Sequence, residues 1–380
     1  MKVLFEKDNF VYDENLILSI SNECGIMQDT ARLLLHRNID SIEKAKIFLS
    51  PSKKYFYNPN LLFGVKEAVE RIKKAKEGNE NILVFGDYDA DGVCATTVLY
   101  SSLNDFGVNV NAVIPEREDG YGLNVEMIKK IISKNKIDVI VTVDCGISDY
   151  EKIEEIKKLG LDVIVTDHHE PPEMLPNCIC INPKIKGQDY PFNGLCGAGV
   201  AYKLSYALIG EKADNYLDFV SLATVADSMD LIDENRNIVY EGLKIFNSNK
   251  LRSCFKYCLG ENVNKQITAQ TLAFSLAPRI NAGGRMGDAN SALNLFLEED
   301  ENEKFNLAVR LNTYNIDRQV QCDEIYNQAK VIIKEKKLYN DKAILIYNES
   351  WKSGFVGIVA SKLVEEYNRP VIVFVGYDGY

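Results

Sequence analysis

Short apolar segments that alternate with helical segments are the feature that most constrains the fold of this chain. Segments with the composition and spacing of helices separate most of these runs, and the helix predicted at 148–160 ends in a glycine. Strands that alternate with helices of about 10–15 residues imply a parallel sheet. The sequence therefore predicts an α/β fold, a parallel sheet with helices on both faces. The apolar runs suited to its buried strands occur at 82–86, 111–115, 138–144, 162–167 and 178–183.

Helical regions and a second, smaller α/β unit flank this sheet. Residues 197–260 have a mainly helical pattern, and few helix breakers interrupt 301–337, which predicts one long connecting helix. A last strand is predicted at 370–375, and because the final unit holds so few strands we expect the sequence to be a fragment. We expect four parts: a helical N-terminal region at 1–80, the main α/β domain at 81–300, the connecting helix at 301–338 and a partial second α/β domain at 339–380.

Composition and charge exclude several classes of protein. Hydrophobic residues make up 46% and charged residues 26%, as in ordinary globular proteins, and no apolar run approaches the roughly 18 residues of a membrane span. The N-terminus carries acids and lacks the apolar core of a secretory signal, so we expect a cytoplasmic location. The net charge of −11 argues against a protein that coats duplex nucleic acid, although a narrow strand channel needs only local positive charge. None of the nine cysteines forms a C-x-x-C pair, so most should be buried thiols.

Three aspartates stand directly after the first predicted strand, in the segment GDYDADG. Asp87, Asp89 and Asp91 alternate there, and three carboxylates this close repel one another unless cations neutralise them. The carboxyl ends of strands are where open α/β sheets bind ligands. The alternative is an acidic turn whose aspartates cap the following helix. The pattern favours a cation site.

Two further strands end in the same kind of residue. Asp144 follows an apolar run, although alone it could be a helix cap, and His168 and His169 follow the next strand. Histidine is the commonest nitrogen ligand for transition metals, and Asp167 or Glu170 could fix its tautomer. A pair of surface histidines in a loop is the alternative. Three of the five predicted strands end in acid or histidine, which favours one shared site.

Two more segments carry chemistry of lower specificity. Asp227 follows an apolar stretch in a predicted helix, with Asp230 and Asp233 as competitors. Arg279, Asn281 and Arg285 lie in the segment 277–289, which we interpret as a Gly-rich phosphate-binding loop, with a structural turn as the alternative.

The combined set is rich in carboxylates with one or two histidines. Oxygen ligands favour Mg²⁺ or Mn²⁺, and histidine shifts the preference towards Mn²⁺, whereas zinc sites usually hold more nitrogen or sulfur. Two such ions can activate a water and stabilise in-line displacement at phosphorus. No P-loop motif is present, so nucleotide-driven chemistry has no support.

These segments together resemble the DHH phosphoesterase superfamily, named for the Asp-His-His at 167–169, and within it the bacterial exonucleases specific for single-stranded DNA. The final segment, 351–374, resembles the start of the associated DHHA1 domain. The main domain would then be the DHH domain and the last one a truncated DHHA1 domain. The resemblance covers nearly the whole chain, at 36–52, 84–97, 114–124, 143–147, 166–172, 182–184, 197–204, 224–236 and 278–289.

The resemblance implies a metal-dependent 5′→3′ exonuclease that hydrolyses single-stranded DNA to 5′ mononucleotides, in repair and recombination. His169 would contact the scissile phosphate or its leaving oxygen, and Asp87 would support the site. The implied partners are single-stranded DNA, a helicase and a single-strand-binding protein, with no membrane. Arg279, Asn281 and Arg285 would grip the DNA backbone. Two Mn²⁺ or Mg²⁺ ions would be held by Asp89, Asp91, Asp144, His168 and Asp227, with Asp144 as the bridge between them.

The chain departs from the family pattern in three ways. It stops before the Gly-rich strand-binding motif of DHHA1, it has no OB-fold segment, and Lys352-Ser353 replaces a common histidine-containing version. Two alternatives therefore remain within the superfamily. One is a phosphodiesterase of short oligoribonucleotides or cyclic dinucleotides, and the other is an inactive truncated form. A non-catalytic repair scaffold is a further alternative, which the intact ligand set disfavours.

Overall fold

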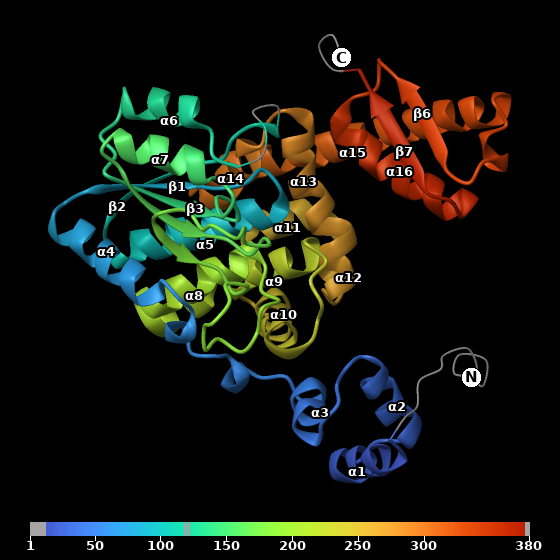
Figure 1. Cartoon of the computed structure of the whole chain (residues 1–380), viewed down its shortest axis with the longest axis horizontal. Helices are drawn as coiled ribbons and strands as arrows, with labels where there is room; N and C mark the ends of the chain where they lie inside the picture. Colours follow the sequence, from blue (N-terminus) through green and yellow to red (C-terminus); the bar gives the residue numbers. More distant parts are fainter. Residues whose placement is uncertain (1–12, 118–119, 121, 377–380) are drawn as a thin grey trace.

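The computed structural model describes residues 13–117, 120 and 122–376 (Figure 1). The ends of the first and last predicted regions, 1–12 and 377–380, lie outside the described residues. So do residues 118, 119 and 121 of the segment 114–124.

Five parallel strands form the central sheet, in the order β2-β1-β3-β4-β5. This confirms the predicted parallel sheet, although β2 ends two residues earlier than expected. The chain leaves the sheet there because the backbone of Ile114 pairs with the Asn290 side chain, whose Nδ2 donates to the Ile114 carbonyl at 2.9 Å. The strands are β1 (Asn81–Phe85), β2 (Asn109–Val113), β3 (Val139–Val143), β4 (Asp162–Thr166) and β5 (Ile179–Ile181).

The strand order reverses between β1 and β3, because β2 lies on one side of β1 and the later strands lie on the other. At such a switch point the loops after the two central strands diverge and leave a crevice at the carboxyl edge of the sheet. Asp87 follows β1 and Asp144 follows β3. The topology alone therefore brings these two carboxylates to one crevice.

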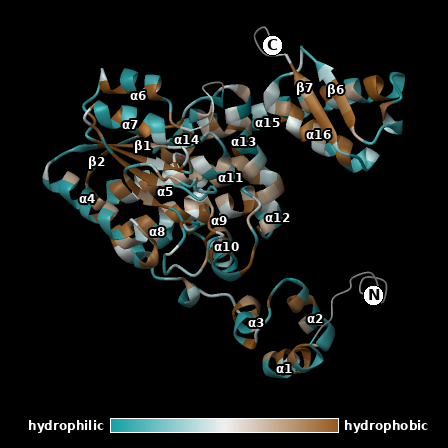
Figure 2. Ribbon diagram, in the orientation of Figure 1, coloured by the Kyte–Doolittle hydropathy of each residue, from teal (hydrophilic) through white to brown (hydrophobic). Residues whose placement is uncertain are grey.

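Helices cover both faces of the sheet, as the sequence predicts. Ile82 and Val84 of β1 pack with the core on one face, and Leu83 and Phe85 pack with the core on the other. Strands buried on both faces are nearly continuous apolar runs, and they form the brown centre of the domain in Figure 2. The first face is covered by α4 (Val65–Glu77), α5 (Ala90–Phe106) and α8 (Gly197–Ile209), and the second by α6 (Val125–Ile132) and α7 (Tyr150–Lys158).

Further helices extend the main domain and lead to the C-terminal unit. The long α15 (Glu301–Glu335) confirms the predicted connecting helix and joins the main domain to a two-stranded parallel sheet in Figure 1. That unit holds β6 (Ile344–Asn348), α16 (Ser353–Tyr367) and β7 (Val371–Val375). The other α-helices of the main domain are α9 (Leu217–Ala226), α10 (Asp233–Phe246), α11 (Ser253–Leu259), α12 (Ala269–Thr271), α13 (Ala277–Met286) and α14 (Asn290–Leu297), with a π-helical turn (Leu272–Leu276) between α12 and α13.

The described part of the N-terminal region is helical, with its own small core. Helices α1 (Glu14–Cys24), α2 (Gln28–His36) and α3 (Ile42–Leu49) pack around Ile17 and Leu34 and lie apart from the sheet in Figure 1. None of the helices described is both long and apolar enough to cross a membrane.

Candidate metal centre

The turn between β1 and α5 is shaped around its carboxylates. Asp89 is the N-cap of α5, and its Oδ1 accepts hydrogen bonds from the backbone N–H groups of Asp91 at 2.9 Å and Gly92 at 3.0 Å. A side chain at Gly92 would meet backbone atoms of Asp87 at 2.4–2.7 Å, so this turn requires glycine there. The predicted capping alternative is therefore present for Asp89, together with the acidic cluster.

Asp91 links two helix N-termini. It lies in the first turn of α5, and its two carboxylate oxygens accept from the N–H groups of Gly197 at 2.6 Å and Ala198 at 2.8 Å, in the first turn of α8. Both helix ends carry partial positive charge, which stabilises a carboxylate between them. Gly197 also has to be glycine, because a Cβ there would lie 2.6 Å from Asp144 Oδ1.

Asp144 leaves β3 in a backbone conformation that most residues avoid. Its φ is +60°, in the left-handed region that aspartate tolerates better than most residues other than glycine. Its N–H still donates to the carbonyl of Thr166 at 3.0 Å, so the sheet hydrogen bonding continues up to this residue. The side chain is buried and faces the ring of His168.

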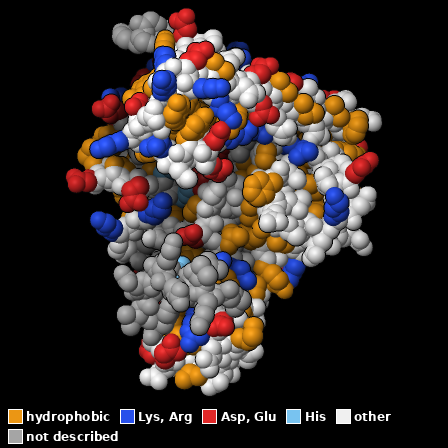
Figure 3. All heavy atoms as spheres, turned by 90° about the vertical axis from the view of Figure 1, so that its right-hand side faces the viewer, with side chains coloured by type: hydrophobic (Ala, Val, Ile, Leu, Met, Phe, Trp, Pro, Cys, Tyr) orange, Lys and Arg blue, Asp and Glu red, His pale blue; other side chains and the backbone are white. Residues whose placement is uncertain are grey.

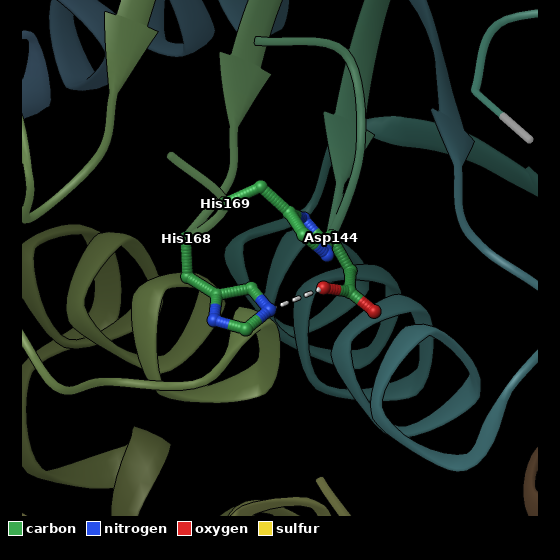
Figure 4. Close-up of side chains that lie close together, drawn as sticks. All are labelled: Asp144, His168 and His169. Atoms are coloured by element: carbon green, nitrogen blue, oxygen red, sulfur yellow. Dashed lines mark ion pairs between the residues drawn. The ribbon is translucent and has the colours of Figure 1, made fainter. Parts of the chain in front are cut away.

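Asp167 binds the backbone of His168 and the ring of His169. Its Oδ1 accepts from the N–H of His168 at 2.7 Å and lies 2.7 Å from Nδ1 of His169, and its Oδ2 accepts from the N–H of Ile147 at 2.9 Å. Asp167 therefore has the ring contact that could fix the tautomer of His169, but no contact with the ring of His168. Figure 4 shows the ring of His168 directed at Asp144, with the ring of His169 beside the same carboxylate.

The ring of His168 lies among three carboxylates. Its Nε2 is 3.1 Å from Asp144 Oδ1, and it is 3.7 Å from an oxygen of Asp91 and from one of Asp227. Asp227 follows α9 as its C-cap residue, so this carboxylate reaches the site from the helical side of the crevice.

Three overlapping sets of side chains could hold cations. In each set the ligand atoms lie within 4.8 Å of one another, and Asp144 and His168 each belong to two sets. Carboxylate oxygens with one or two imidazole nitrogens suit Mn²⁺ or Mg²⁺. The sets are Asp87, Asp89 and Asp144; Asp91, His168 and Asp227; and Asp144, His168 and His169.

Burial and mutual repulsion raise the pKa values of the carboxyl groups in this crevice. Burial and the charge of Asp89 raise the pKa of Asp87 to about 7, of Asp91 to about 8 and of Asp227 to about 6. Burial, followed by the charge of Asp91, raises the pKa of Asp144 well above its usual value. A divalent cation would reverse these shifts by favouring the ionised carboxylates.

The pKa values of the two histidines shift in opposite directions. Burial, followed by the charge of His169, lowers the pKa of His168 to about 4, so this ring is neutral and can offer a nitrogen lone pair to a metal. The hydrogen bond to Asp167 raises the pKa of His169, which favours a protonated ring. The pair therefore combines one neutral ring with one that favours the protonated form.

Comparison with known proteins gives a consistent set of relatives. A family model described as the DHH family, N-terminal domain, matches residues 81–224. The single-stranded-DNA-specific exonuclease RecJ of Bacillus subtilis (strain 168) is 39% identical over 364 residues, which is 95% of this chain and 46% of that protein. The crystal structure of RecJ from Thermus thermophilus in complex with Mn²⁺ gives a TM-score of 0.80 at 29% identity, over 96% of this chain and 53% of that one.

A further crystal structure, of exonuclease RecJ bound to manganese, is 33% identical with a TM-score of 0.71, over 83% of this chain and 80% of that one. The chain belongs to the RecJ family. It spans about half the length of the first curated RecJ relatives, 46% of the Bacillus subtilis protein and 62% of that from Haemophilus influenzae.

The prediction that residues 277–289 form a Gly-rich phosphate-binding loop is wrong, because residues 277–286 form helix α13. Arg279 binds the Asn312 side chain and the Ser275 carbonyl, so its guanidinium is occupied within the helical layer. Asn281 accepts the N–H of Ala90 at 2.8 Å and thereby supports the first turn of α5. Arg285 is half-buried and donates to the carbonyl of Gly354 in the C-terminal unit.

Sequence reasoning gave no role to three basic residues near the site: Arg117, Arg318 and Lys184. The guanidinium of Arg117 lies over the ring of Tyr88, 5.1 Å from the ring centroid. Tyr88 stands between Asp87 and Asp89 in the sequence. Burial and the charges of Arg117 and Arg318 lower the pKa of Arg285, so three guanidinium groups gather near α13. Lys184 acts electrostatically on His168 and Asp227. Lys184 follows β5 and Arg117 follows β2, both at the carboxyl ends of their strands, a position that could have indicated both residues.

Proposed function

We propose that this chain carries the hydrolytic site of a metal-dependent 5′→3′ exonuclease that releases 5′ mononucleotides from single-stranded DNA, in repair and recombination. The observation that carries the proposal is the convergence of three overlapping cation-binding sets on one crevice, at the switch point of the sheet. The curated relatives named as single-stranded-DNA-specific exonucleases support the substrate.

Five side chains would hold two Mn²⁺ or Mg²⁺ ions. Asp144 belongs to two of the three sets and would bridge the ions, while Asp87 would support the acidic side from β1. Bound there, the ions would activate a water and stabilise the charge that develops at phosphorus. The other ligands would be Asp89, Asp91, His168 and Asp227.

His169 would act on the leaving group. Asp167 holds Nδ1 of the ring, and the raised pKa keeps the imidazole protonated to higher pH than an ordinary histidine. A protonated ring can donate a hydrogen bond to the scissile phosphate and a proton to the leaving oxygen. The side chain is 45% exposed, so substrate can reach it.

The basic groups near α13 would hold the DNA backbone. Arg117, Arg285 and Arg318 concentrate positive charge that a phosphate would neutralise. On the face shown in Figure 3, basic and acidic side chains are interspersed rather than separated by sign, which favours a local grip over a broad cationic coat. The contacts of Arg279 and Asn281 favour an indirect role for these two, through the helix on which they lie.

Digestion of single strands labelled at either end tests the proposal. With Mn²⁺, a 5′ label should appear at once as mononucleotide, whereas a 3′ label should remain on shortening strands, and a chelator should stop both. Parallel reactions with duplex DNA, short oligoribonucleotides and cyclic dinucleotides distinguish the alternatives. Faster hydrolysis of either ribonucleotide substrate, or no mononucleotide release with either metal, would reject the proposed activity.

A further inference from the structure

Two half-buried thiols lie close together at the edge of the central sheet formed by its last strand. Sγ of Cys178 is 3.8 Å from Sγ of Cys180, and Cys180 is in β5, the last strand of the sheet. Both pack against the apolar core between the sheet and α7, while Ile179 faces the opposite core. The alternation of strand side chains therefore places the two thiols on the same face. All nine cysteines of the chain are free.

The surroundings of this pair favour a reactive sulfur. A hydrogen bond with the thiol of Cys178 lowers the pKa of Cys180, against the opposing effects of burial and of the Asp167 charge, whereas the same bond and burial raise the pKa of Cys178, near which the Lys157 ammonium adds positive charge. Lys157 is held in place because it also donates to the carbonyl of Asn177. The thiolate is the nucleophilic form of cysteine, so a stabilised thiolate at a partly exposed position is the usual target of oxidants.

We propose that Cys178 and Cys180 form a modification site at which a hydroperoxide produces an intramolecular disulfide. The Cys180 thiolate attacks one peroxide oxygen, the O–O bond breaks, and a sulfenic acid forms while the other oxygen leaves as hydroxide or alkoxide. The Cys178 sulfur then attacks the Cys180 sulfur, the S–O bond breaks, and the thiol proton leaves with the hydroxide as water. Two thiols lose two electrons in total, and one peroxide is reduced.

The spacing of Cys178 and Cys180 allows a disulfide, and the strain in that disulfide makes it easy to reduce. Residues two apart in an extended strand have Cα atoms about 6.6 Å apart, near the upper end of the roughly 4.4–6.8 Å that disulfides span. Closure to about 2.05 Å between the sulfurs therefore strains the segment before β5. Strained disulfides are the readily reduced ones, so the modification should be reversible by a thiol reductant.

No other cysteine of the described chain offers the same combination. Cys254 and Cys258 lie on α11, but both are almost fully buried. Cys24 is partly exposed and lies on α1, with no second thiol among its hydrogen-bond partners. Selective oxidation of one pair is therefore the expected pattern.

Mass spectrometry after peroxide treatment of the native chain tests the proposal. The chain is exposed to hydrogen peroxide, its remaining thiols are alkylated, and it is digested without reductant. We expect the peptide that contains Cys178 and Cys180 to lose two hydrogen atoms and to resist alkylation, and dithiothreitol to restore both thiols. The buried Cys254 and Cys258 should stay reduced over the same time.

Serine variants make the test specific. C178S and C180S should each form no intramolecular disulfide, and the double variant should lose no thiols under conditions in which the parent chain loses two. Circular dichroism checks that the variants are folded. Full alkylation of both cysteines after peroxide treatment, or equal thiol loss in the double variant, would overturn the proposal.

Discussion

Asp144 combines burial, a left-handed backbone and contact with His168 at one position. The conformation turns the chain out of β3 so that the side chain enters the crevice instead of continuing along the sheet. The cost of holding an aspartate there is small compared with that of a β-branched residue. The residue therefore supplies both the turn and the proposed bridging ligand.

Asp144→Asn should abolish metal-dependent hydrolysis while leaving the fold intact. Asparagine tolerates the same positive φ and has nearly the same shape, but it lacks the charge that would bridge two cations. We expect the rate to fall at least about a hundredfold and Mn²⁺ affinity to fall with it. Initial rates and calorimetric titration with Mn²⁺ measure the two effects.

Asp162→Asn is the matched control. Asp162 is the first residue of β4, at the amino ends of the strands, and forms an ion pair with Arg71. Its loss should leave hydrolysis unchanged. Parent-like activity in Asp144→Asn would refute the bridging role.

The residues that the sequence identified share one physical property. Asp87, Asp89, Asp91, Asp144 and the two histidines follow strands of one parallel sheet, and the carboxyl ends of those strands meet at one edge. Asp227 could be assigned only through the family resemblance, because it follows a helix whose packing the local pattern does not specify. Arg117 lies in the family-like segment 114–124, but its role was missed because its place depends on how the loop after β2 folds over Tyr88.

At the scale of elements, α13 shows that glycines can signal close packing as well as turns. A Cβ at Gly284 would lie 2.7 Å from the Tyr88 carbonyl, and one at Gly283 would lie 2.8 Å from that of Asp288. Pro278 is tolerated because it occupies the first turn of the helix. The sequence was interpreted as a loop because these residues usually break helices. Here they let α13 approach the β1–α5 turn.

Asn281→Ala should weaken metal binding through α5 rather than through the substrate. The lost hydrogen bond to the Ala90 N–H loosens the helix turn that carries Asp89 and Asp91, at a cost of about 1 kcal/mol in the free energy of unfolding. We expect weaker Mn²⁺ binding with no substrate present, measured by calorimetry, and a modest fall in stability, measured by urea denaturation.

Asn281→Asp keeps an acceptor oxygen and is the comparison for this variant. Asn281→Asp should keep most of the stability that Asn281→Ala loses. If Asn281→Ala instead raised KM for DNA and left Mn²⁺ affinity unchanged, direct contact with the DNA backbone would be the better assignment.

At the scale of the whole molecule, the site makes the stability of the fold depend on metal. Without cations, Asp227, Asp87 and Asp91 have pKa values of about 6, 7 and 8 in the folded chain, compared with about 3.9 in an unfolded one. For these groups the folded state therefore binds protons that the unfolded state has already released. The stability that the three carboxyls contribute falls as the pH rises through this interval, and it outweighs the opposite contribution of His168, whose pKa is lowered.

The metal-free chain should lose stability between about pH 5 and pH 8, and Mn²⁺ should restore it most strongly at the upper end. Urea denaturation at both pH values, with chelator and with Mn²⁺, measures the change. Asp91→Asn should flatten the pH dependence of the metal-free protein. A metal-free chain whose stability rises across this interval would contradict the proposed origin of the shifts.

The length of helix α15 determines both the distance and the rotation between the main domain and the C-terminal unit. Its 35 residues extend about 52 Å, with Leu307 and Leu311 packed on the main domain and Ile325 and Ile333 packed on the C-terminal unit. Each residue added between these two contacts would turn the C-terminal unit by about 100° around the helix axis, whereas two full turns would lengthen the spacing by about 10 Å with nearly the same facing. The orientation of the C-terminal unit and its distance from the main domain could thus be varied separately.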